Sequence, residues 1–298
     1  MANDEVVIKP TTDLFIAALY SAPQNEPILR SLLSGVMTDI GQPPVVKATV
    51  LNPFNIKEYP ADKEIRLDVW VEDESRAFYN VEIQRAEHTN FCERMLYYWG
   101  GKYGSQLQRG QHYGMLRPVR SIIITEFPIF PTLKRLHAVF ELRARENPDV
   151  KFSEHCQMHV LRLGDLIRND LAGLDQFGSV LQGWMQFWTF GDKIEEDKMS
   201  AMLQDVPEVQ RAYEEFKRFK ADPVMQEKVK ARQRFLDEQQ LLLGGAHAEG
   251  KAEGKAEGKA EGKIETAIMM KKKGLDNTLI AEVTGLPVSE IERLDQET

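Results

Sequence analysis

The spacing of apolar residues divides the chain into a part with strands and helices and a part with helices alone. Helical spacing predicts two helices within 11–38, interrupted at 21–26, and another helix over 90–108. Alternating apolar and polar positions predict strands near 45–51, 64–71, 77–85, 119–127 and 155–162. After Leu166 the strand signal is lost. This order is typical of an α/β fold, a mixed sheet flanked by helices, with a helical C-terminal extension.

Two of the predicted strands carry polar residues where a buried sheet would carry apolar ones. The first contains Asp68, and the second contains Glu82 and Gln84, which share one face because side chains alternate along a strand. Folding back around Ser75 places Asp68 opposite Glu82. Opposed carboxylates repel each other, and a divalent cation between them reverses this effect. A second interpretation stays open, in which both are half-exposed residues paired with arginines such as Arg85.

Charge is distributed unevenly around these two strands. The whole chain is acidic, with a net charge of −8, which argues against a broad surface for nucleic acid. Residues 62–84 include seven acidic and three basic side chains, whereas residues 85–120 include six basic and two acidic ones. A metal-dependent phosphodiesterase needs such a pair of neighbours, since carboxylates hold the ion and cations bind phosphates. The candidates for contacts to nucleic acid are Arg85, Arg94, Lys102 and Arg109.

Asp68, followed in the next strand by Glu82-Ile83-Gln84, resembles the motif of the PD-(D/E)XK nucleases. More narrowly, it resembles that of the Rpn recombination-promoting nucleases, also called PD-(D/E)XK nuclease family transposases. The resemblance continues through the segment 94–113 and covers residues 10–165. It implies a restriction-endonuclease-like mixed sheet flanked by helices. It also implies a DNA endonuclease that hydrolyses phosphodiester bonds in recombination or in the biology of mobile elements.

The resemblance implies a role for each residue of the motif. Asp68 and Glu82 would be the metal-binding carboxylates, with the backbone carbonyl of Ile83 as a third ligand for Mg²⁺, or for Mn²⁺ or Ca²⁺. Gln84 would orient the attacking water, and it stands where the wider superfamily usually has a charged lysine. Glu26 would be an outer acidic ligand. Two alternatives to this enzyme are a protein that binds DNA or a partner through the same fold without cutting, and an actual transposase.

The C-terminal part contains an internal repeat. The tetrapeptide Ala-Glu-Gly-Lys occurs four times between Ala248 and Lys263. On a helix this period aligns like charges, which repel within one chain but can face the opposite charges of a second copy. The segment is either a self-associating helix, which would make the protein a dimer or a higher oligomer, or a solvated linker. The expected divisions are a nuclease-like core over 1–165, a helical extension packing on it over 166–243, the repeat over 244–263, and a small helix-turn-helix-like cap over 264–298.

Other features of the sequence bear on location. No apolar run is long enough to span a membrane, and the first residues lack the basic and apolar regions of a signal peptide. Cys92 and Cys156 lack the spacing of a zinc site and are typical of reduced cytosolic cysteines. His155 and His159 share one face of a predicted strand, where structural histidines are more common than metal ligands. We therefore expect a cytoplasmic protein, and the resemblance to the Rpn nucleases implies a bacterial one.

Overall fold

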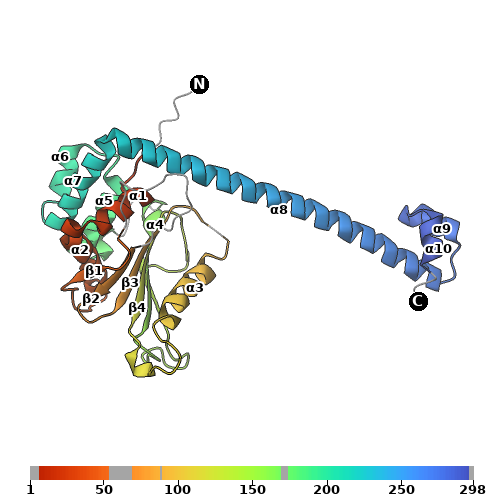
Figure 1. Ribbon diagram of the computed structural model, residues 1–298, viewed down its shortest axis with the longest axis horizontal. Helices are drawn as coiled ribbons and strands as arrows, with labels where there is room; N and C mark the ends of the chain where they lie inside the picture. Colours follow the sequence, from red (N-terminus) through yellow and green to blue (C-terminus); the bar gives the residue numbers. More distant parts are fainter. Residues whose placement is uncertain (1–6, 54–68, 88, 169–173, 295–298) are drawn as a thin grey trace. The chain divides into compact units, whose positions relative to one another are not determined.

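The computed structural model describes residues 7–53, 69–87, 89–168 and 174–294. A mixed sheet with six described strands in the order β1-β2-β3-β4-β6-β5 lies within residues 48–161 (Figure 1). Strands β3, β4 and β6 run parallel, and the other pairs are antiparallel. The strands are β1 (Ala48–Val50), β2 (Val69–Asp73), β3 (Phe78–Gln84), β4 (Val119–Thr125), β5 (His137–Glu141) and β6 (Cys156–Leu161). The predicted α/β fold, a mixed sheet flanked by helices, is confirmed.

Helices precede, interrupt and follow the sheet. The first two are separated by a short 3-10 turn at Pro23–Asn25, where the sequence predicts the break. Helix α3 joins β3 to the parallel strand β4. The helices of this part are α1 (Asp13–Ser21), α2 (Glu26–Thr38), α3 (Phe91–Gly104), α4 (Leu163–Arg168), α5 (Ser179–Phe190), α6 (Glu196–Met202) and α7 (Pro207–Ala221). A sheet with a crossover helix and further helices on its other side gives a layered α/β arrangement (Figure 1).

The two faces of the sheet are covered differently. On one face, α1, α2, α5 and α7 build a large core with the sheet, and Trp184 and Phe187 of α5 are fully buried in it. On the other face, Phe91 and Met95 of α3 pack with Ile123 of β4 and its neighbours. Alternation along each strand therefore sends neighbouring side chains into two separate environments.

A chain of polar contacts crosses the sheet on the side of the large core. Tyr79 donates to Asp73 over 3.0 Å, and Arg120 donates to Tyr79 and, over 3.0 Å, to Gln157. Gln157 donates in turn to Glu141 over 2.8 Å. Each member comes from a different strand, so the chain links β2, β3, β4, β6 and β5 side by side. The polar groups satisfy one another, which offsets the cost of drawing them out of water.

The contacts divide the chain into two compact units, Met1–Arg232 and Gln233–Thr298. Helix α8 (Pro223–Lys272) includes the whole repeat segment. The second unit also contains α9 (Asn277–Thr284) and α10 (Val288–Arg293). Ile280 of α9, Ile291 of α10 and Ala267 of α8 form a small core there. In the described part of the chain, no helix combines the length and the apolar character that crossing a bilayer requires. The finer division of the chain at residues 165 and 243 stays a prediction.

Candidate active site

The β2–β3 hairpin sets the faces on which its side chains lie. Its turn lacks Asn-Gly and closes through Asp73, whose Oδ1 accepts from the backbone N–H groups of Ser75 at 2.8 Å and Ala77 at 2.9 Å. Arg76 takes the left-handed conformation, with φ 67°. The register places Val69 opposite Val81, whose side chain belongs to the large core. Asp68, the predicted partner of Glu82, lies outside the described residues.

Glu82 and Gln84 lie at the carboxyl end of β3, on the face that α3 covers. They are adjacent in register to Ile123 and Thr125 of the parallel strand β4. Gln84 Nε2 donates to Glu82 Oε1, and Arg94 Nη2 donates to Gln84 Oε1 over 2.5 Å. All three side chains are half-buried. The structure therefore joins two predicted catalytic residues to a residue that the charge pattern singled out for phosphate binding.

The start of α3 determines where Arg94 lies. Asn90, directly before the helix, adopts the left-handed conformation, with φ 59°. Phe91 and Met95 are buried, and the ring of Phe91 meets that of Phe127 edge to face, with the ring centroids 5.5 Å apart. Residues three and four apart on a helix lie on one side, so this anchorage turns the side of α3 that carries Arg94 toward the sheet. The position of Arg94 is thus set by packing on the smaller core.

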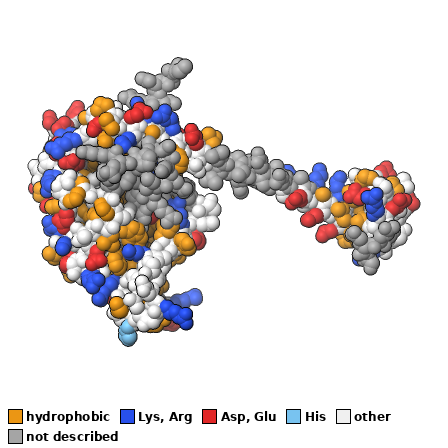
Figure 2. Space-filling view, in the orientation of Figure 1, with side chains coloured by type: hydrophobic (Ala, Val, Ile, Leu, Met, Phe, Trp, Pro, Cys, Tyr) orange, Lys and Arg blue, Asp and Glu red, His pale blue; other side chains and the backbone are white. Residues whose placement is uncertain are grey.

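The other predicted cations have contacts with residues outside this group or are exposed. Lys102, near the far end of α3, lies over the ring of Phe78 at 4.4 Å from its centroid, and burial lowers its pKa against the raising effect of Glu72. Arg85 pairs with Glu126 across 3.9 Å, and Arg109 is exposed on the loop after α3. Figure 2 shows one face of the molecule, where Lys and Arg are scattered among acidic and apolar side chains.

Glu126 is a residue that the sequence patterns did not single out. It follows β4 directly, and its backbone N–H donates to the Gln84 carbonyl over 2.9 Å. Its carboxylate accepts from Thr11 and pairs with Lys9 at 3.4 Å. A charged residue at the carboxyl end of an apolar parallel strand is the signal that could have marked it. Glu26, the expected outer ligand, accepts from the Ala48 N–H over 3.0 Å, and its role as a ligand stays a prediction.

The donors present bear on the kind of metal. Around Gln84 the described side chains offer carboxylate and amide oxygens, the ligands that Mg²⁺ prefers, rather than the thiolates and imidazoles typical of zinc. Within the described residues, no three His, Cys, Asp or Glu side chains come together as a metal cluster. Of the predicted ligands, the Glu82 carboxylate and the Ile83 backbone belong to the described strand β3, and the third, Asp68, lies outside the described residues. The carboxylate and amide oxygens at the end of β3 fit a hard divalent ion of the magnesium type.

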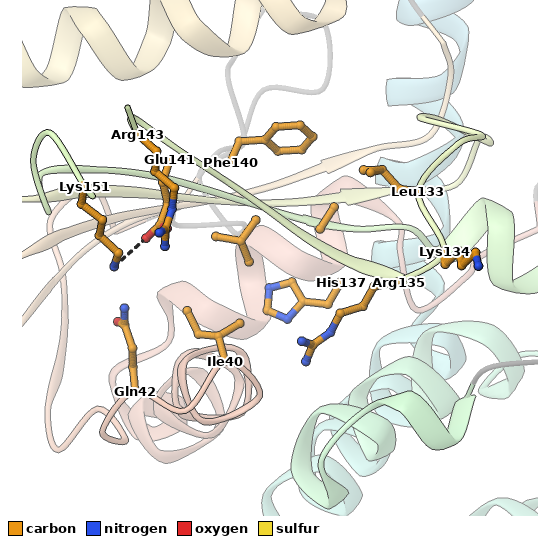
Figure 3. A pocket seen from close by; sticks show the side chains of 12 residues that line it. Ile40, Gln42, Leu133, Lys134, Arg135, His137, Phe140, Glu141, Arg143 and Lys151 are labelled. Atoms are coloured by element: carbon orange, nitrogen blue, oxygen red, sulfur yellow. Dashed lines mark hydrogen bonds and ion pairs between the residues drawn. The ribbon is translucent and has the colours of Figure 1, made fainter. Parts of the chain in front are cut away.

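A cavity of about 560 Å³ lies along the edge strand β5 (Figure 3). Its lining includes four cationic side chains, and Glu82, Gln84 and Arg94 are not among the residues that line it. Three of the cations already face carboxylates. Arg143 and Lys151 pair with Glu141, and Arg135 pairs with Asp39 at 3.0 Å. The cavity is therefore separate from the Glu82–Gln84 group, and three of its four Lys and Arg side chains are paired with carboxylates.

Comparisons with known proteins place the chain in a family. A search of curated proteins and a search of solved structures find no match. A family model described as "PD-(D/E)XK nuclease family transposase" matches residues 10–245. The match includes the hairpin, α3 and the remaining strands, and it extends past residue 165 into the helices that follow. The resemblance inferred from the motif is confirmed: the chain belongs to the PD-(D/E)XK nuclease family transposases.

Proposed function

We propose that this protein is a metal-dependent DNA endonuclease of the Rpn type, acting in recombination or on mobile elements. Membership of the nuclease family supports the hydrolysis of phosphodiester bonds in DNA as the reaction class. The observation that carries the proposal is the placement of Glu82 and Gln84, side by side at the carboxyl end of β3 and joined to Arg94. Because its substrate would be DNA inside a bacterial cell, we expect it to act in the cytoplasm.

The residues divide the chemical work among themselves. Mg²⁺, held by Asp68, Glu82 and the carbonyl of Ile83, would supply the positive charge that activates water and offsets charge on the phosphate. Gln84 uses one N–H of its amide on Glu82 and has a second N–H with which to orient the attacking water. The cations Arg85, Arg94, Lys102 and Arg109 would bind phosphates along the strand. Hydrolysis then breaks one P–O ester bond as the water oxygen bonds to phosphorus.

Nicking of supercoiled plasmid tests this function. In the presence of Mg²⁺, Asp68→Ala and Glu82→Ala should each lower the rate by more than about 100-fold, beyond the loss that an outer contact of a metal site causes. Glu93→Ala, which removes an exposed carboxylate from the first turn of α3, is the matched control and should nick like the wild type. Equal nicking by all these proteins would point to a contaminating nuclease and remove Asp68 and Glu82 from the site.

A specific observation favours a second candidate, a DNA-binding or assembly protein that keeps the fold and does not cut. Gln84 is neutral, and both polar atoms of its amide are already engaged by Glu82 and Arg94. Such a protein would retard DNA in a gel with Ca²⁺ or Mg²⁺ and would leave the plasmid intact. Binding without any nicking, in a preparation whose fold is verified, would establish this candidate over the endonuclease.

We also propose that the protein is a homo-oligomer through its C-terminal helices. The support is the repeat, whose Glu and Lys stripes lie on a continuous helix. A methyl group placed on Gly254, Gly258 or Gly262 would meet no atom within 4 Å, so the described chain leaves this stripe uncovered. A second copy would cover it and bring opposite charges together.

A further inference from the structure

Arg94 is the residue through which α3 reaches the end of β3. Its Nη2 donates to Gln84 Oε1 over 2.5 Å, and Gln84 Nε2 donates to Glu82 Oε1. A guanidinium has donors and no acceptor, so the amide oxygen must face Arg94. The amide nitrogen then faces the carboxylate. The contact with Arg94 therefore fixes which way round the Gln84 amide lies.

The charge of Arg94 is also in an unusual position. Three other arginines, whose side chains are at most 17% exposed, face carboxylates: Arg120 with Asp73 at 3.6 Å, Arg162 with Asp165 at 3.0 Å, and Arg232 with Asp13 at 3.2 Å. Arg94 meets the neutral amide of Gln84 instead, and its Nε is buried without a hydrogen-bond partner among the described residues. No carboxylate of the described residues lies within ion-pair distance of this half-buried cation, and Glu82 is joined to it only through the Gln84 amide. Its charge is available to an anion that approaches the end of β3.

Both features serve a hydrolytic site. If the Gln84 amide were reversed, its oxygen would face Glu82, and two acceptors would repel each other. The N–H groups would then point away from the carboxylate and from a water held beside it. A cation close to the scissile phosphate would in addition stabilise charge that develops there, because preorganised charge in a half-buried site is screened little by water.

We propose that Arg94 is a positioning residue for the hydrolysis proposed above. It holds the Gln84 amide with its nitrogen toward Glu82 and the attacking water, and it brings to the site the positive charge that glutamine lacks. This role rests on the proposed function and differs from that of a general contact to the DNA backbone. A backbone contact contributes equally to substrate and transition state, whereas a positioning residue acts on the chemical step.

Kinetics of plasmid nicking separate the two roles. Arg94→Met should lower kcat by about 10–100-fold and change KM by less than about 3-fold, because the Gln84 amide loses its orientation. Arg94→Lys keeps a donor and a charge and should recover part of kcat. Arg109→Met removes an exposed cation from the loop after α3 and should raise KM alone. A rise in KM without a fall in kcat for Arg94→Met would overturn the proposal.

Moving the charge provides a second test. Gln84→Lys alone places two cations side by side and should be less active than the wild type. Gln84→Lys combined with Arg94→Met leaves one cation at the end of β3 and should be more active than either single variant. A double variant no more active than Arg94→Met would contradict the proposal.

A readout without metal or DNA separates this inference from the proposed function. Selective ¹⁵N labelling of glutamine gives a side-chain amide signal for Gln84, assigned through its loss in Gln84→Glu. The signal should be protected from hydrogen exchange in the wild type and lose that protection in Arg94→Met, while the other glutamine signals report an intact fold. If this holds but the wild type does not nick, the endonuclease fails and the positioning contact stands. If Arg94→Met leaves the hydrogen-exchange protection of the Gln84 amide unchanged, Arg94 is not a positioning residue.

Discussion

His159 is a fully buried side chain on the large-core side of β6. Its Nδ1 lies 3.0 Å from His137 Nε2, and His137 Nδ1 lies 2.7 Å from Asp39 Oδ2. Burial lowers the pKa of His159 to about 3, so the imidazole is neutral in the folded protein near neutral pH. Burial raises the pKa of Asp39, but hydrogen bonds from His137 and the Gly178 N–H outweigh this and lower it overall. The group is therefore a structural one that depends on pH.

This arrangement predicts a loss of stability in mild acid. The folded pKa of His159, about 3, lies below its ordinary value of 6.5, so the unfolded chain binds more protons between the two. The free energy of unfolding should fall as the pH decreases from about 6.5 toward 3, and protonation of Asp39 adds to the loss in its lower range. Urea unfolding can be followed by tryptophan fluorescence from about pH 7 to about pH 4.5.

His159→Gln should show a smaller fall over that range than the wild type, because the variant lacks the titrating ring. His112→Gln, at the exposed residue directly before the 3-10 turn Tyr113–Met115, serves as the control and should follow the wild type. An unchanged pH dependence in His159→Gln would exclude this histidine as the source.

At the residue scale, the sequence predicted features that depend on the alternation of side chains along a strand. It did not predict contacts that depend on how a helix packs on the sheet. Glu82 and Gln84 share a face because a strand has a period of two, and this follows from the sequence alone. The contact between Gln84 and Arg94 joins a strand to a helix, and its existence depends on how Phe91 and Met95 pack on the sheet. Nothing in the local sequence specifies such packing.

At the element scale, Arg120 is the central link of the polar chain across the sheet. Arg120→Met would remove the guanidinium that contacts Tyr79, Gln157 and Asp73. The Asp73 carboxylate would lose its ion pair, and only 5% of its side chain is exposed. Breaking a buried pair in this way should lower the free energy of unfolding by about 2–4 kcal/mol. Urea unfolding checks the value.

Arg143→Met is the matched control. Arg143 also pairs with a residue of these polar contacts, Glu141, but has 36% of its side chain exposed. It should cost less than about 1 kcal/mol. Equal losses of unfolding free energy for Arg120→Met and Arg143→Met would show that the polar contacts across the sheet stabilise the fold no more than a surface ion pair does.

The strand β5, which the sequence did not predict, differs in burial from the predicted strands β4 and β6. β4 and β6 are buried along nearly their whole length and have clear apolar patterns. β5 is short, pairs with β6 alone among the described strands, and mixes His137 and Glu141 with apolar residues. Its identity as a strand depends on the hydrogen bonds that β6 provides, and these are not visible in its own residues.

At the scale of the whole molecule, the repeat predicts self-association. One variant replaces Glu249, Glu253, Glu257 and Glu261 with Lys, and the other replaces Lys251, Lys255, Lys259 and Lys263 with Glu. Each variant alone should be monomeric in sedimentation velocity, because like charges would meet at the interface. An equimolar mixture should form heterodimers, and the wild type should associate as its concentration rises.

Removal of the repeat and everything after it, in a chain ending at Leu243, should likewise abolish association. A wild type that remains a monomer at every concentration would leave the repeat as a solvated linker. Self-association that both charge-reversed variants retain would mean that the interface lies elsewhere.

The hairpin, Gln84 and Arg94 have one property in common that bears on how this protein can be altered. All lie within the continuous segment Val69–Gly104, which runs from β2 through β3 to the end of α3. The contacts between them close only short loops, so they cost little chain entropy and are favoured early in folding. We expect such a segment to be exchangeable as a cassette between relatives, carrying its glutamine and its arginine together. A chimera that takes Gln84 from one relative and Arg94 from another would separate a pair that exchange of the whole segment keeps together.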